Sequence, residues 1–92
     1  MSVIDIQRSH DLGKEKARTA ADALADNLAR KLDVQSEWQG DRLMFRRSGV
    51  NGHLDVSDTE LHVHLELGMM LRPFKQRIEE EIHTRLDRVT SA

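Results

Sequence analysis

The sequence has 92 residues, of which 38% are hydrophobic and 33% are charged, and its formal net charge is −2. This length suits one domain over residues 1–92 with a thin core, because a chain so short buries only roughly 60–65% of its unfolded surface. The negative charge argues against a nucleic-acid-binding protein. The absence of cysteine excludes disulfides, thiolate catalysis and cysteine-ligated zinc.

The first ten residues alternate polar and apolar side chains without a continuous hydrophobic stretch, so we expect no signal peptide. No segment approaches the ~18 consecutive apolar residues of a membrane span. We therefore expect a cytoplasmic protein without a transmembrane segment.

Residues 4–7 alternate apolar and polar side chains, which predicts a short strand with one buried face. A helix follows, capped by Asp11 or Gly13 and ending near Leu32. Its apolar residues recur at helical spacing: Ala17, Ala20, Ala21, Leu24, Ala25, Leu28 and Leu32.

Four short strands are predicted between residues 34 and 67. Residues 34–39 and 42–47 form a hairpin across a turn at residues 40–41, which places Trp38 opposite Leu43. The next turn spans residues 48–52, where two glycines supply positive φ angles: Gly49 and Gly52. Residues 53–57 and 60–67 are the last two strands, joined by a turn at Asp58 and Thr59.

A second helix is predicted from about Leu71, with Pro73 in its first turn, where a missing N–H costs least. Its apolar stripe consists of Leu71, Phe74, Ile78, Ile82, Leu86 and Val89. The predicted order is β-α-β-β-β-β-α. We expect an α+β fold, in which both helices cover one face of a single antiparallel sheet.

Histidines dominate the opposite face of the last two predicted strands. A two-residue turn at 58–59 places His53 opposite His64 and Asp55 opposite His62, with all four side chains on the polar face. Imidazole and carboxylate groups are good zinc or nickel ligands, so these four residues are a candidate metal site. The simpler interpretation is a solvated sheet face that is rich in histidine.

Consecutive apolar residues mark the junction between the last strand and the second helix: Met69, Met70 and Leu71, with Phe74 close by. Neighbouring residues at such a junction cannot all face one core. Because methionine is flexible and polarisable, they are a candidate contact surface for a partner. The alternative is ordinary closure of the core at the sheet edge.

Motifs of catalysis are absent from the sequence, which has no Gly-x-Ser-x-Gly, no phosphate-binding Gly-x-x-x-x-Gly-Lys and no His-Glu-x-x-His. The single Glu-x-x-His, from Glu80 to His83, lacks the second copy that a di-iron site requires. We therefore predict a protein that is not an enzyme and that needs no cofactor.

Taken together, the motifs resemble those of the polyhydroxyalkanoic acid system protein family, from Ser2 to about Asp87. The resemblance rests on Ile4-Asp-Ile6 with His10, Lys14-Glu-Lys-Ala-Arg18, Trp38-Gln-Gly-Asp-Arg-Leu43, Phe45-Arg-Arg-Ser-Gly-Val-Asn-Gly52, Leu65-Glu-Leu-Gly68 and Ile78-Glu-Glu-Glu-Ile82. These are turn and packing signals, so their combined order and spacing carry the resemblance.

This resemblance implies an accessory or binding protein of the bacterial system that makes or uses the storage polyester polyhydroxyalkanoate. Its partners would be the granule surface or granule-associated proteins, with a homo-oligomer as a further option. Two alternatives stay open. One is a metal-binding protein or metal-dependent enzyme that uses the histidine-rich face. The other, disfavoured by the thin core, is a carrier of a hydroxyacyl group held between the helices and the sheet.

Overall fold

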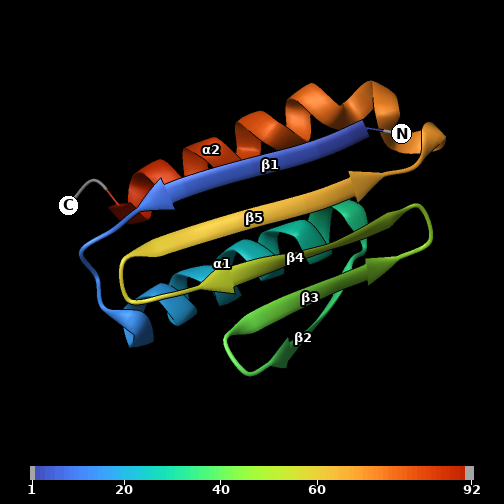
Figure 1. Cartoon of the computed structure of the whole chain (residues 1–92). Coiled ribbons are helices and arrows are strands. Elements are labelled where there is room, and N and C mark those ends of the chain that lie inside the picture. The colour runs from blue at the N-terminus through green and yellow to red at the C-terminus, as the bar shows by residue number, and fades with distance from the viewer. Residues whose placement is uncertain (1, 91–92) are drawn as a thin grey trace.

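The computed structural model describes residues 2–90, and the side chains of residues 2–88. Its elements follow the predicted order, with one short 3₁₀ helix added before the last helix (Figure 1). They are β1 (Ser2–Ser9), α1 (Lys14–Leu32), β2 (Gln35–Gln39), β3 (Arg42–Arg47), β4 (Val50–Val56), β5 (Glu60–Leu67), η1 (Met69–Phe74) and α2 (Lys75–Thr90).

The five strands form one antiparallel sheet in the order β1-β5-β4-β3-β2. Trp38 lies opposite Leu43 in the β2–β3 hairpin, as predicted. Gly40 has a φ of 62°, which explains why the tight turn between these strands contains glycine. The chain places β1 beside β5, so the first and last strands in sequence are neighbours.

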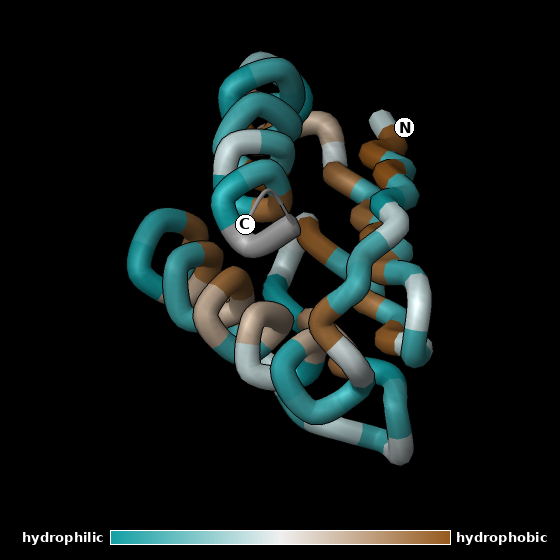
Figure 2. The backbone as a smooth tube through the Cα atoms, turned by 90° about the vertical axis from the view of Figure 1, so that its left-hand side faces the viewer, coloured by the Kyte–Doolittle hydropathy of each residue, from teal (hydrophilic) through white to brown (hydrophobic). Residues whose placement is uncertain are grey.

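Both helices cover the same face of the sheet, which confirms the predicted α+β architecture (Figure 1). Viewed from the side, the two helices form one layer and the sheet the other, and hydrophobic and hydrophilic positions alternate along the strands (Figure 2). The core contains alternate residues of every strand except β2, together with one stripe from each helix. Its largest fully buried side chains include Phe45, Ile4, Leu43, Leu54, Leu61, Leu65, Leu67 and Ile82.

Polar contacts fix the helices in place. Asn27, which is buried on α1, donates from Nδ2 to Glu81 Oε1 at 3.2 Å and accepts at Oδ1 from Arg85 Nη2 at 3.3 Å. Near the other end of α1, the Arg18 guanidinium lies 3.9 Å above the centre of the Trp38 ring. The indole Nε1 donates to Asp22 at 2.7 Å. The first set of contacts joins the two helices, and the second joins α1 to the β2–β3 hairpin.

The prediction that Gly52 is a turn glycine is wrong. β4 begins at Val50, and Gly52 lies inside it, opposite Phe45 on β3 and Leu65 on β5. A Cβ atom at this position would lie 2.2 Å from the backbone oxygen of His64 and 2.7 Å from Leu65 Cδ2. Glycine is required here because neighbouring atoms approach too closely for a side chain.

The predicted start of the second helix is also wrong. Residues 69–74 form η1, which contains Pro73, and α2 begins at Lys75. Phe74 is 48% exposed instead of lying in the buried stripe, because the 3₁₀ segment does not continue the rotation of α2. Ile78, Ile82 and Leu86 are buried as predicted, whereas the Val89 side chain lies outside the described residues.

Candidate functional site: a histidine face and a methionine surface

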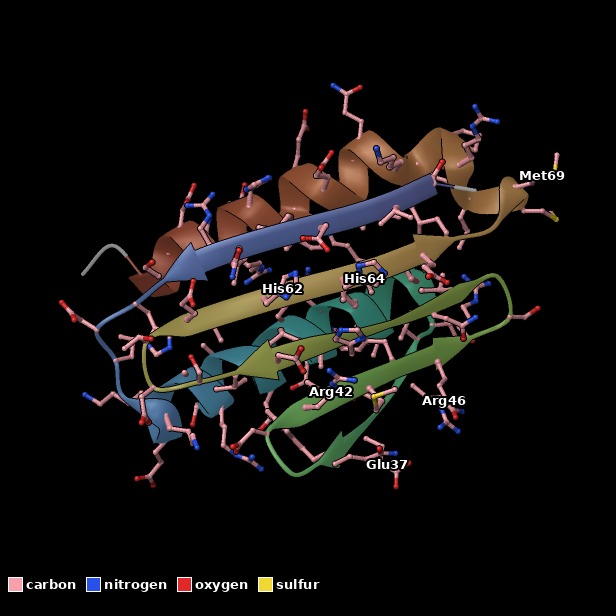
Figure 3. The ribbon with its side chains drawn as sticks, viewed as in Figure 1. Glu37, Arg42, Arg46, His62, His64 and Met69 are labelled. Atoms are coloured by element: carbon pink, nitrogen blue, oxygen red, sulfur yellow. The ribbon has the colours of Figure 1, made fainter. Side chains whose placement is uncertain are left out.

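The histidine face comprises His53 and Asp55 on β4, with His62 and His64 on β5. The predicted register is confirmed, because His53 pairs with His64 and Asp55 pairs with His62. The rings of His53 and His64 are stacked, with their centres 5.4 Å apart. Figure 3 shows His62 and His64 on the sheet face that turns away from the helices.

Asp5 on β1 is the residue that organises this face, and the sequence did not identify it. His62 Nε2 and His64 Nδ1 each lie 2.9 Å from a different oxygen of the Asp5 carboxylate. Asp5 pairs directly with His64 across β1 and β5. Alternation along β1 does place Asp5 on the polar face, but the sequence alone does not say which strand lies beside β1.

On the other side of the stacked rings, the Asp55 carboxylate is bound by Arg42. Asp55 accepts two hydrogen bonds from Arg42, from Nε at 2.7 Å and from Nη2 at 3.3 Å. His53 Nε2 lies 3.6 Å from Asp55, and His64 Nε2 lies 3.6 Å from Glu66, so both distances are longer than a hydrogen bond. The face is therefore a network of alternating acidic and basic groups.

These contacts shift the protonation of the two stacked rings in opposite directions. The hydrogen bond to Asp5 raises the pKa of His64, against a smaller opposing effect of burial. Burial, reinforced by the Arg42 cation, lowers the pKa of His53. The hydrogen bonds from His64 and His62 lower the pKa of the Asp5 carboxyl. As the pH falls, His64 is therefore protonated before His53.

The structure brings the four predicted metal ligands onto one face, but their donor atoms serve other contacts. Within residues 2–90, no group of three or more histidine, aspartate or glutamate side chains is arranged to hold a metal ion. His62 and His64 would have to exchange their hydrogen bonds with Asp5 for a metal. The metal interpretation stays a prediction, and titration with Zn²⁺ tests it.

The methionine surface comprises Met69, Met70, Leu71 and Phe74, all on η1. Figure 3 shows Met69 at the end of the molecule where β5 leads into η1. Met69 is 82% exposed and Met70 is 88% exposed, whereas Leu71 is half-buried and packs against the core. The segment is anchored at its start, because the Gly68 N–H donates to the Gly49 carbonyl at 2.7 Å. The two methionine side chains thus project from a fixed backbone instead of closing the core.

No helix within residues 2–90 is long and apolar enough to cross a membrane. No curated protein and no solved structure is significantly similar to the chain. One family model does match it, over residues 4–89, with the description putative polyhydroxyalkanoic acid system protein. This range covers nearly the whole sequence and agrees with the motifs that suggested the same family. The chain therefore belongs to the polyhydroxyalkanoic acid system protein family.

Proposed function

We propose that this protein is a non-catalytic accessory protein of the bacterial polyhydroxyalkanoate system, which attaches to the storage granule through its methionine surface. The observation that carries the proposal is the exposure of Met69 and Met70, at 82% and 88% of their surface. Apolar side chains that are exposed next to one another favour a contact surface more than scattered ones do. The family description, polyhydroxyalkanoic acid system protein, supports a role in a cell that stores this polyester.

The composition of this surface suits an irregular apolar surface such as that of a polyester. Methionine has an unbranched, polarisable side chain that adapts to many shapes. Phe74, 48% exposed, adds an aromatic ring to the same segment. Arg72 and Lys75 also lie on or next to η1, and their charged ends can stay in water while the apolar side chains are covered.

The proposal of a non-catalytic role rests on the chemistry of the histidine face. Its acidic and basic groups pair with one another, and they lie on the solvated face of a sheet. The sequence contributes no cysteine and no nucleophile motif to them. We therefore regard this face as a structural and titratable surface. The location that we propose, in the cytoplasm at the granule, is supported by the family alone.

Co-sedimentation with purified polyhydroxyalkanoate granules tests the attachment. The double variant M69E/M70E places two charges on the methionine surface, and the control A23E/Q35E adds the same charge at exposed positions on α1 and β2. Burial of two methionines is worth more than 1.4 kcal/mol, so the first variant should bind about tenfold more weakly or worse. The control and M69L/M70L should bind like the wild type.

Two further experiments distinguish contact with the polymer from contact with a granule protein or with a second copy of the chain. Binding to granules stripped of protein supports contact with the polymer, whereas binding only to native granules points to a granule protein. Sedimentation velocity of the free protein asks whether a second copy covers the same surface. Equal granule binding by M69E/M70E and the wild type would show that the methionine surface is not the contact.

A further inference from the structure

A groove lies between α1 and α2, on the side of the sheet opposite the histidine face. Its volume is about 420 Å³, within the range of about 300–1,000 Å³ that small-molecule sites occupy. Side chains from α1, β3, η1 and α2 line it. They are Leu28, Lys31, Leu32, Arg47, Leu71, Phe74, Arg77, Ile78 and Glu81.

The lining separates into an apolar part and a cationic part. Five aliphatic or aromatic side chains come from the two helices and η1: Leu28, Leu32, Leu71, Phe74 and Ile78. Three cations and one carboxylate complete the groove. The carboxylate of Glu81 is already engaged, because Lys31 Nζ lies 3.0 Å from Oε1 and Asn27 donates to the same oxygen.

Two cations of the groove are left to act on a ligand. The side chains of Arg47 and Arg77 form no hydrogen bond or ion pair with any of the residues that the structure describes. They come from different elements, the end of β3 and the first half of α2. The protein as a whole carries a net charge of −2, so this local excess of positive charge stands out against its surroundings.

We infer that this groove binds a medium-chain aliphatic carboxylate, with the chain along the apolar lining and the carboxylate at Arg47 and Arg77. A guanidinium matches a carboxylate through two parallel N–H donors, which makes arginine well suited to this head group. The ligand needs an aliphatic chain because the remaining side chains of the groove are apolar or already paired, so they can contact only an apolar group. A small inorganic anion would leave that surface exposed to water.

This inference does not depend on attachment to granules. Leu71 and Phe74 belong to both the groove and the methionine surface, whereas Met69 and Met70 do not line the groove. The variant M69E/M70E should therefore keep its affinity for a carboxylate even though it loses granules. Loss of granule binding and loss of carboxylate binding are therefore measured separately, and either proposal can fail while the other holds.

Isothermal titration with sodium decanoate, below its micelle concentration, tests the inference. The wild type should bind decanoate, and affinity should rise by up to about fourfold for each methylene from hexanoate to decanoate. The uncharged decan-1-ol should bind more weakly because it lacks the carboxylate. The variant R47Q/R77Q should lose about tenfold in decanoate affinity, as expected for the loss of charge-assisted hydrogen bonds.

The matched control is R30Q/R46Q, which removes the same charge from two neighbouring arginines that do not line the groove. It should bind decanoate like the wild type. All four substituted arginines are exposed, and a circular dichroism spectrum verifies that both variants remain folded. The inference is overturned if the wild type shows no binding, if R47Q/R77Q and R30Q/R46Q bind alike, or if affinity is independent of chain length.

Discussion

The Asp5 carboxylate and His64 Nδ1 lie 2.9 Å apart, joining the first strand of the chain to the last. This contact links the protonation of the histidine face to the stability of the sheet. Because the pKa of His64 is raised in the folded state, its contribution to stability is fully present below the unfolded value of about 6.5. That contribution disappears as the pH rises through the higher folded value.

The substitution Asp5→Asn should lower the pKa of His64, because the amide carries no charge to stabilise the imidazolium. The burial effect on His53 would remain, and it disfavours folding as the pH falls below about 6.5. The stability difference between wild type and D5N should therefore grow from pH 8 to pH 6. NMR titration of the histidine rings and urea denaturation measure both effects, with D26N as the control. A pH-independent difference would show that the contact has no electrostatic role.

Gly52 should tolerate no side chain. The substitution Gly52→Ala would place a Cβ 2.2 Å from a backbone oxygen of the neighbouring strand, which cannot move without disrupting the sheet. We expect a loss of about 3 kcal/mol in the free energy of unfolding, measured by urea denaturation. Gly40→Ala is the comparison, because its φ of 62° is unfavourable but its surroundings are open. That variant should lose only about 1–2 kcal/mol. Equal losses would mean that the close approach at Gly52 is unimportant.

Asn27 should contribute to the stability of the fold through its hydrogen bonds to α2. The substitution Asn27→Ala removes both hydrogen bonds that this buried side chain makes to α2. We expect a loss of about 1–3 kcal/mol in the free energy of unfolding, which is the net contribution of two hydrogen bonds to charged groups. Gln76→Ala, at an exposed position on α2, should change stability by less than about 0.5 kcal/mol. An unchanged urea denaturation midpoint in N27A would show that Asn27 does not stabilise the packing of the helices.

The histidine face should bind Zn²⁺ weakly. His62 and His64 would have to release Asp5 before they could act as ligands, and Asp55 is held by Arg42. We expect isothermal titration of untagged protein with zinc chloride to show no site of micromolar affinity. A micromolar site that disappears in His64→Ala would restore the metal interpretation of His53, Asp55, His62 and His64.

Much of the fold was predictable because its signals are local. The alternation of Leu61, Val63 and Leu65 gave the last strand, and the two-residue turn at 58–59 gave the correct pairing of His53 with His64. The position of Asp5 was not predictable in the same way. Its partners are 57 and 59 residues away, and only the strand order of the sheet brings them together.

Local signals also failed where one residue type serves two purposes. Glycine occurs in turns and at close approaches, so Gly52 was assigned to the wrong class. Pro73 suits the first turn of an α-helix but is equally compatible with the 3₁₀ segment that precedes α2. The groove between the helices depends on how α1, η1 and α2 pack together. No spacing in the sequence indicates that Arg47 and Arg77 line the same cavity.

Oxidation of methionine on and off the granule tests the proposed contact most directly. Dilute hydrogen peroxide converts exposed methionine to the sulfoxide, and mass spectrometry of peptides gives the rate at each position. Met69 and Met70 are the probes, and Met44, half-buried on the opposite face beside His53, is the internal reference. We predict that granule binding slows the oxidation of Met69 and Met70 and leaves the oxidation rate of Met44 unchanged. Equal rates at Met69 and Met70 in the free and granule-bound protein would contradict it.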